Sequence, residues 1–552
     1  MATSKLTFAV CVLACLLAAS ECLEYKCHHD EFASKMEIEE ITVLPGKSVT
    51  GRALATELRN FRIMIDYSKS DTFISSNTAL TSLYEMSKRI LVNTKQYFET
   101  HLKIMSPETI SIPASSCGIP SITTNAVTDQ PIDLYVIINA ENDAGTSYFA
   151  AASTCKTDET TARPIVGVYY LNFANMKGSK MYEFFYFTTY THEFMHIIFF
   201  SAGLFDKYRD PSDSTKAVPA SHYEYVMNGT NKQFTKLKYP SVIAFAQKYY
   251  RCPSLEYIPL EDGGGSGTAG SHWEKLFFPE DIMNPTIESP AKISPFTIEM
   301  IKASGWYTVV GDPSSYYDWG KDDGCVLSSS SCPTSQEYCP AGADLQKNIC
   351  STDYTGKSTC SALADYFGDC ILKRKLEVSC LLNLPDDINM GSEEVYGPHS
   401  RCIPWHKKDT GDVSAECHTV RCINNEVQLR LKSNITKTCR YKGEIISFGG
   451  KWQITCPDPL LLCNNFANRC PMDCNGVNGF CLNAGKCFCF NGFSGSDCGT
   501  CSTCKPITDP FITSSNYSGD FVSVDAYNLK ENGSTIWHLL AAGALAGALW
   551  TL

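Results

Sequence analysis

The pattern of apolar positions predicts alternating strands and helices in the first half of the chain. Residues 60–66 alternate enough for a strand, and the apolar runs at 132–139 and 164–171 are typical of strands buried in a core. Between the first two of these strands, apolar side chains recur at three- and four-residue steps over residues 78–104, which predicts a long helix. A further helix is predicted over residues 242–250. This order of elements predicts an α+β fold.

Residues 184–200 form a second type of apolar run. As a helix, this run would be apolar on nearly all sides, so we expect it to be buried against the sheet. It contains His192-Glu193-Phe194-Met195-His196. Residues four apart lie on one face of a helix, so His192 and His196 can both face one metal ion. Glu193 lies next to that face, where it can take a proton from a water on the metal. This H-E-x-x-H spacing is the zinc-protease arrangement.

A catalytic zinc site with two helical histidines needs at least one more protein ligand and one open position. His272 is the strongest candidate, because it follows the glycine-rich stretch 261–270 directly and precedes Met283 in Asp281-Ile282-Met283-Asn284-Pro285. A methionine turn beneath a three-histidine zinc is the metzincin arrangement. His272 lies far along the chain from His196, which predicts an inserted segment between them. The remaining candidates, each weaker, are His28, His29, His101, His222, His399, His406 and His418.

Composition and charge narrow the class of protein. The chain has 552 residues, 44% of them apolar, which predicts a globular protein of several domains rather than a disordered one. Its formal net charge of −12 argues against a nucleic-acid partner. The glycine run at 261–270 lacks the Gly-Lys-Ser/Thr signature and has no strand immediately before it, so no nucleotide is expected as a ligand.

The two ends of the chain predict secretion and attachment to the cell surface. Residues 1–20 are typical of a signal peptide. A polar spacer, 505–535, precedes the apolar tail 536–552, after which no basic residue follows. This order favours a removed glycolipid (GPI) anchor signal over a membrane-spanning terminal helix. Asn228 and Asn434 lie in glycosylation sequons, as do two asparagines of the spacer.

In a secreted chain, disulfides are the default use of the 28 cysteines. Cys117, Cys155 and Cys252 are the only ones between residue 28 and residue 320. Because three is odd, one of them should bond to the later region or stay free. Cys117 and Cys155 could bridge the loops around the predicted strands. The later cysteines crowd into 321–462, which predicts a disulfide-rich C-terminal domain.

Cys27 precedes the predicted catalytic region, in a pro-segment that we assign to residues 21–57. Its thiolate could fill the open zinc position and keep a precursor inactive until the segment is removed. Alternatively, Cys27 forms a simple disulfide with Cys22. The residues alone do not favour either use. We divide the catalytic region into an N-terminal subdomain, 58–200, and a central subdomain, 201–320.

Within residues 463–504, six cysteines have the spacing C-x3-C-x6-C-x5-C-x-C-x8-C: Cys470, Cys474, Cys481, Cys487, Cys489 and Cys498. Spacing alone allows fifteen ways to pair six cysteines. The pattern resembles an EGF-like module, and that resemblance implies pairing of first with third, second with fourth, and fifth with sixth.

Several motifs together resemble the leishmanolysin family of surface zinc metalloproteases. They are the H-E-x-x-H box, Cys252-Pro253-Ser254-Leu255-Glu256, the run from Leu260 to Glu274 that contains Gly-Gly-Gly-Ser-Gly-Thr-Ala-Gly-Ser-His-Trp-Glu, and Ile282-Met283-Asn284-Pro285. The resemblance covers roughly residues 58–462, and also Cys27-His28-His29-Asp30. It implies a metzincin-type core with a mixed sheet and long helices.

The same resemblance implies the chemistry of the site. His192, His196 and His272 would bind one zinc ion, Glu193 would be the catalytic base, and Met283 would lie in the methionine turn. It also favours the inhibitory-thiolate use of Cys27. The implied function is a zinc metalloendopeptidase that cleaves polypeptides at the cell surface, with a link to cell adhesion.

One residue departs from the family pattern, which usually has glycine three residues after the second histidine. Phe199 stands there. Glycine adopts a positive φ at little cost and phenylalanine does not. We therefore expect either that the helix continues to Gly203 or that Phe199 is strained. The alternative functions are an inactive, EGF-bearing adhesion or receptor-like surface protein, and a purely structural zinc site, which would need four closed ligands.

Overall fold

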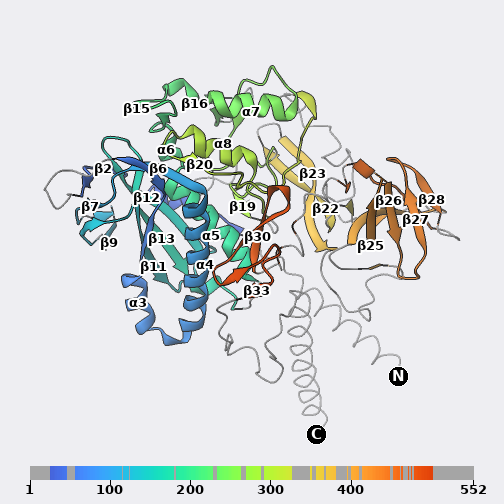
Figure 1. Ribbon diagram of the computed structural model, residues 1–552, viewed down its shortest axis with the longest axis horizontal. Helices are drawn as coiled ribbons and strands as arrows, with labels where there is room; N and C mark the ends of the chain where they lie inside the picture. The colour runs from blue at the N-terminus through green and yellow to red at the C-terminus, as the bar shows by residue number, and fades with distance from the viewer. Residues whose placement is uncertain are drawn as a thin grey trace, which may run out of the picture.

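The computed structural model describes residues 25–46, 56–325 and 349–501, apart from gaps inside the last two ranges (Figure 1). The gaps are 115, 118, 124, 179–181, 228–232, 263–268, 276, 288–290, 351–355, 366–367, 381–393, 396–399, 409–412, 425, 448–451, 461, 464–469, 471–473 and 475–477. The predicted signal peptide, spacer and apolar tail, the centre of the glycine run and Asn228 lie outside the described residues.

A five-stranded mixed sheet forms the centre of the N-terminal part, and it confirms the α+β expectation. Its order is β2 (Glu39–Ile41), β12 (Ala150–Asp158), β13 (Pro164–Asn172), β11 (Leu134–Glu141) and β5 (Ile63–Asp66). Only β12 and β13 run antiparallel to one another; the other neighbouring pairs are parallel. Every residue of β13 is buried, as its continuous apolar run predicted.

The strand predicted over residues 60–66 is in fact two strands in two sheets. β4 (Glu57–Asn60) pairs with β6 (Leu102–Ser106), whereas β5 pairs with β11. The break falls at Arg62, whose guanidinium makes two 2.8 Å bonds to the buried Asp133 carboxylate. Satisfying that buried carboxylate turns the chain from one sheet to the other. The alternation of side chains carried no sign of this ion pair.

Two long helices cover the sheet and lie side by side in Figure 1. α4 (Thr81–His101) follows a short 3-10 turn, η1 (Thr78–Leu80), within the predicted range. α5 (Glu183–Ile198) is buried along nearly all of its length, as its composition predicted. It packs closely on β13 at Gly167, where a Cβ atom would lie 2.4 Å from the Ile197 side chain. Glycine therefore lets the helix approach the sheet.

The central part, residues 201–320, has three α-helices and several short strands among its described residues. The helices are α6 (Ala202–Phe205), α7 (Pro240–Tyr250) and α8 (Pro295–Ala303), and α7 agrees with the predicted helix. Cys252 bonds to Cys325 of the later region, which is one of the two outcomes that the odd count of early cysteines allowed. Cys117 and Cys155 also pair, but they join strands β8 (Ser116–Cys117) and β12 rather than loops.

The cysteine-rich region contains two antiparallel sheets. One has the order β21 (Ile349–Cys350), β22 (Gly356–Asp365), β23 (Gly368–Ser379). The other has the order β27 (Thr436–Cys439), β26 (Glu426–Arg430), β25 (Val413–Ile423), β24 (Ser400–Lys407), β29 (Trp452–Thr455), β28 (Ile445–Ser447). Four disulfides stabilise this region: Cys350–Cys402, Cys380–Cys417, Cys422–Cys463 and Cys439–Cys456. Asn434 lies exposed in a turn between β26 and β27, and its glycosylation stays a prediction.

Smaller elements complete the described chain. The short helices are α2 (His29–Ala33), α3 (Ser68–Ser75), η2 (Phe173–Asn175) and η4 (Ala220–His222). The short strands are β1 (Tyr25–Lys26), β3 (Leu44–Pro45), β7 (Ile110–Ile112), β9 (Ile119–Thr123), β10 (Val127–Gln130), β14 (Arg209–Asp210), β15 (Asp213–Ala217), β16 (Tyr223–Met227), β17 (Gln233–Leu237), β18 (Ile258–Pro259), β19 (Thr286–Ile287) and β20 (Thr308–Val309). In the described part of the chain, no helix combines the length and the apolar character needed to cross a bilayer.

The last described stretch, residues 470–501, has two small hairpins and is called the C-terminal cysteine segment below. Cys470 bonds to Cys481, Cys474 to Cys487, and Cys489 to Cys498, which is the order implied by the resemblance to an EGF-like module. Its elements are β30 (Gly479–Leu482), η8 (Asn483–Gly485), β31 (Lys486–Cys489), β32 (Phe493–Ser494) and β33 (Thr500–Cys501).

This segment lies against the two long helices rather than apart from them (Figure 1). The Phe480 ring lies 5.9 Å from that of Phe184 and 5.5 Å from that of Phe187, both on α5. Phe490 also contacts Phe187, with ring centroids 4.6 Å apart, and Phe488 contacts Tyr97 of α4. Aromatic side chains at such distances dominate the energetics of an interface. The segment therefore shares a hydrophobic core with the first part of the chain.

We predict that Phe480→Ala lowers the stability of the helical layer itself, by roughly 3 kcal/mol, because it opens a cavity under α5. Scanning calorimetry of the whole chain measures the shift of the transition in which α4 and α5 unfold. Tyr441→Ala, which truncates an aromatic side chain that is 63% exposed, should leave that transition unchanged. Equal effects of the two substitutions would show that the segment is an independent appendage.

Candidate metal centre

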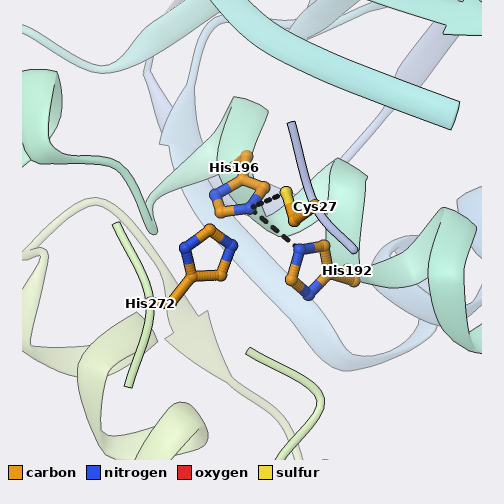
Figure 2. Close-up of side chains that lie close together, drawn as sticks. All are labelled: Cys27, His192, His196 and His272. Carbon is orange, nitrogen blue, oxygen red and sulfur yellow. Dashed lines mark hydrogen bonds between the residues drawn. The ribbon is translucent and has the colours of Figure 1, made fainter. Parts of the chain in front are cut away.

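Three histidines and one cysteine from distant parts of the chain meet at one buried point (Figure 2). His192 and His196 project from α5, His272 from the segment after the glycine run, and Cys27 from the segment after β1. One ligand atom of each residue lies within 4.8 Å of all the others, and all four side chains are buried. The structure thus brings together the three histidines and the cysteine that the sequence singled out.

The two helical histidines face each other across one turn of α5, as the four-residue spacing predicted. Their Nε2 atoms are 3.0 Å apart, and their rings are nearly perpendicular, at 87°. The His272 ring lies 5.3 Å from that of His192 and 4.8 Å from that of His196. The three rings therefore surround one point from three sides.

The other nitrogen of each helical histidine is fixed by a backbone carbonyl. His192 Nδ1 donates to the Ile282 oxygen at 2.5 Å, and His196 Nδ1 donates to the Phe200 oxygen at 2.6 Å. Burial lowers the pKa of His192 to about 3, and it lowers the pKa of His196 well below the usual value, so both rings are neutral. With Nδ1 protonated, each Nε2 presents a lone pair, which is the metal-binding form.

This arrangement fits a metal ion. Two lone pairs 3.0 Å apart repel each other unless a cation lies beside them. Nitrogen and sulfur donors in this number are the set that zinc takes. The residues present thus fit a zinc site with three histidine ligands and a cysteine at the fourth position.

Phe199 ends α5 without a strained backbone, so both alternatives predicted for it are wrong. The helix stops at Ile198, well before Gly203, and Phe199 has φ −160°, an extended value that any residue adopts. The amides of Phe199 and Phe200 both bond to the Met195 oxygen, and the chain turns there. This turn brings the Phe200 carbonyl back to His196. The phenylalanine at this position is therefore compatible with an intact ligand.

Met283 is fully buried in a turn that also holds His192 in place. The Asn284 amide bonds to the Asp281 backbone oxygen at 3.1 Å, and the Ile282 carbonyl inside the turn accepts from His192. The Trp273 amide, directly after His272, donates to the Met283 oxygen at 2.9 Å. The methionine turn thus contacts both segments that carry the three histidines, α5 and the segment of His272.

Asp281 organises this turn, and the sequence analysis gave it no role. Its carboxylate accepts from the Met283 amide at 2.6 Å, the Thr297 hydroxyl at 2.8 Å and the Ser294 amide at 3.2 Å. Burial raises its pKa to about 6. The available signal was its position two residues before the methionine, where an aspartate commonly bonds the backbone of a turn.

Cys27 is free and buried, so the alternative of a disulfide with Cys22 is wrong. Its Sγ atom lies 3.5 Å from His196 Nε2 and 3.4 Å from the Glu193 carboxylate, and the His29 amide donates to it at 3.3 Å. Its own amide bonds to the Pro285 oxygen, and β1 pairs with β19 just after the methionine turn. Burial and the Glu193 charge raise the pKa of the thiol, so only a cation here would favour the thiolate.

Two further residues position the pro-segment, and the sequence analysis gave them no such role. The His29 ring stacks on that of His196, with centroids 3.9 Å apart, and its nitrogens bond to the Ala152 oxygen and the Ser201 hydroxyl. Burial lowers the pKa of His29 to about 4, so it stays neutral. Asp30 accepts a hydrogen bond from Ser271, next to His272. Their adjacency to Cys27 was the only sequence signal.

Glu193 is buried beside the histidines, with a carboxylate oxygen 3.7 Å from His192 Nε2. Apart from His29, the other described histidines make their contacts with residues outside this cluster. His28 contacts Ser147, His101 bonds to the Tyr97 oxygen, and His406 contacts Thr455. His222 stacks near Tyr239 and His418 near Trp405, while His399 lies outside the described residues.

Comparison with known families matches residues 89–378, a little over half of the chain, to leishmanolysin. A leishmanolysin homolog of Crithidia fasciculata is 26% identical over 319 residues, covering 52% of this chain and 47% of the relative. A ciliated left-right organizer metallopeptidase of Danio rerio is 26% identical over 357 residues, covering 61% and 55%. Leishmanolysin of Leishmania major is 27% identical over 183 residues, covering 33% and 28%. The chain spans about a third to a half of the length of the curated relatives it matches.

We predict that Asp281→Ala lowers the free energy of unfolding by roughly 3 kcal/mol, because it leaves several buried donors without an acceptor. Thr297→Val removes one of those donors and leaves the Trp273 indole N–H without its acceptor, and it should still cost less, about 1–2 kcal/mol. Denaturant unfolding, followed by tryptophan fluorescence, measures both. An Asp281→Ala loss no larger than that of Thr297→Val would contradict the role of Asp281 as the organiser of the turn.

Proposed function

Because the chain belongs to the leishmanolysin family of metallopeptidases, we propose that it is a zinc endopeptidase made as a latent precursor. The observation that carries the proposal is the convergence of Cys27, His192, His196 and His272 on one buried point, with Glu193 beside it. A purely structural zinc site would not need a buried glutamate in contact with the fourth ligand.

In this proposal, His192, His196 and His272 bind one zinc ion, and Met283 lies in the turn beneath them. When bound, zinc lowers the pKa of a coordinated water towards about 7 and polarises the scissile carbonyl. Glu193 accepts a proton from the attacking water and delivers it to the leaving amine. The carbonyls of Ile282 and Phe200 hold the two helical imidazoles in the ligand tautomer throughout.

Cys27 supports latency because it occupies the position that the water and the substrate carbonyl would need. Its Sγ contacts both His196 and the proposed base Glu193. The pairing of β1 with β19 and the stacking of His29 on His196 hold the thiol there. Activation then requires release of the pro-segment, residues 21–57.

The disulfides fit a secreted, extracellular protein. We further propose that the glycolipid anchor predicted from the tail holds the protein at the cell surface, where it cleaves polypeptides and has a secondary role in adhesion.

An inactive EGF-bearing adhesion protein is the competing function. Phe480 and Phe490 of the C-terminal cysteine segment pack against α5, which supports a structural role for these aromatic side chains.

We predict that the processed protein contains one zinc per chain and cleaves casein. Glu193→Ala should retain the zinc and lose about 10²–10⁴-fold of the rate, because only the proton acceptor is removed. Metal analysis and a casein assay measure the two quantities on the same sample. Bound zinc together with no cleavage by the unmutated, processed protein would favour the inactive alternative.

A second prediction concerns the precursor. Cys27→Ala should make the uncleaved chain active, because a side chain without a ligand atom cannot hold the fourth position. His28→Ala is the control, because His28 is next to Cys27 but contacts Ser147 rather than the metal centre. It should leave the precursor without peptidase activity. A Cys27→Ala precursor that is as inactive as the unmutated precursor would show that the thiol is not the inhibitor.

A further inference from the structure

The pro-segment does more than place Cys27, because it also adds a strand to the central sheet. β2 pairs in parallel with the end of β12, with Glu39 opposite Lys156, Glu40 opposite Thr157 and Ile41 opposite Asp158. The Glu159 amide extends this ladder by bonding to the Ile41 oxygen at 3.1 Å. β2 is the outermost strand on this side, so β12 becomes the edge of the sheet when the pro-segment leaves.

Two lysines of the catalytic part bind two consecutive glutamates of β2. The Lys156 ammonium pairs with the Glu39 carboxylate, and Lys207, just after α6, pairs with Glu40 at 3.3 Å. Successive side chains of a strand point to opposite faces, so the two lysines hold the strand from both sides. Lys156 is only 1% exposed. With β2 in place this buried ammonium needs an anionic or polar partner, and departure of Glu39 leaves it without its acid, so a new segment on β12 that buries it again would have to supply one.

Apolar contacts flank this acidic pair. Ile38 and Ile41 pack against the main core, and the Ile38 side chain lies over Gly203, where a Cβ atom would be 3.1 Å from it. The short helix α2 lies on β12 and connects this strand to Cys27. The site thus fits an extended segment of the pattern Ile-Glu-Glu-Ile that continues from the metal centre.

We propose that this edge of β12, with Lys156 and Lys207, becomes a binding site for an acidic, extended segment of the polypeptide substrate. The inference rests on the proposed function, in which the pro-segment is displaced. The substrate would add a strand to the sheet through main-chain hydrogen bonds, and the lysines would select glutamate or aspartate at two adjacent positions. Proteins with an acidic stretch some distance from the cleaved bond would be preferred substrates.

Peptide binding tests this proposal without depending on catalysis. The full chain carries Glu193→Ala and a site for a specific protease between residues 46 and 56, and it is cut and dialysed until the pro-segment is released. The probe is a fluorescent peptide with the sequence of residues 36–45. We expect Glu39→Gln in the peptide to weaken binding roughly tenfold, because it removes the partner of a buried lysine. Glu40→Gln should weaken it less, because Lys207 is 26% exposed.

A double-mutant cycle makes the assignment specific. Lys156→Gln in the protein should abolish the preference for glutamate over glutamine at position 39 of the peptide, and Lys207→Gln should abolish the same preference at position 40. Lys207→Gln keeps the test decisive if the buried Lys156→Gln protein does not fold. Lys216→Gln, at a lysine that is 72% exposed, should leave both preferences intact.

Two results would overturn the proposal: no binding of the parent peptide, or equal affinity for the glutamate and glutamine peptides. Neither result concerns the enzyme activity, because the Glu193→Ala protein is used throughout. Conversely, an unmutated protein that fails to cleave casein would count against the proposed peptidase and leave the measured peptide affinities standing.

Discussion

The metal centre depends on two hydrogen bonds from the histidines of α5 to backbone carbonyls. Each bond fixes a tautomer and points the other ring nitrogen at the same place, which a pair of histidines on a free helix would not do. The carbonyls belong to the methionine turn and to the turn that ends α5, so both turns must be correctly folded before the site exists. The close packing of α5 on Gly167 and the network around Asp281 serve this requirement.

Residues 25–46, in the proposed pro-segment, are folded against the catalytic part. This segment pairs with β19 beyond the metal centre, places Cys27 at the histidines, stacks His29 on His196, and finally adds β2 to the central sheet. Several independent contacts must be broken to release it. These contacts keep the Cys27 thiol at a high effective concentration beside the histidines.

Much of this arrangement follows from local sequence. The H-E-x-x-H spacing determines that His192 and His196 share a face, and the apolar runs of β11, β13 and α5 determine which elements are buried. The sequence singled out His272, Met283 and Cys27 as candidates, but it took the resemblance to a family to assign the two residues after α5 and to favour one of the two open uses of Cys27, because nothing local links them to α5. The prediction for Phe199 failed because the chain turns there with a negative φ of −160°, so the position does not need glycine.

The remaining features are non-local and left no periodic signal. The partners Lys156 and Glu39 are 117 positions apart, and the contact between Phe480 and α5 joins distant parts of the chain. Arg62 and Asp133 interrupt a strand that alternation predicted to be continuous. Each is a pairing of buried groups that only the folded chain brings together.

Zinc K-edge X-ray absorption of the uncleaved precursor tests the central claim most directly. Our account predicts one sulfur ligand at about 2.3 Å together with histidine nitrogens at about 2.0–2.1 Å. In Cys27→Ala the sulfur contribution should vanish and the nitrogen contribution should remain. A precursor spectrum with no sulfur ligand, or a sulfur contribution that survives the substitution, would contradict the account.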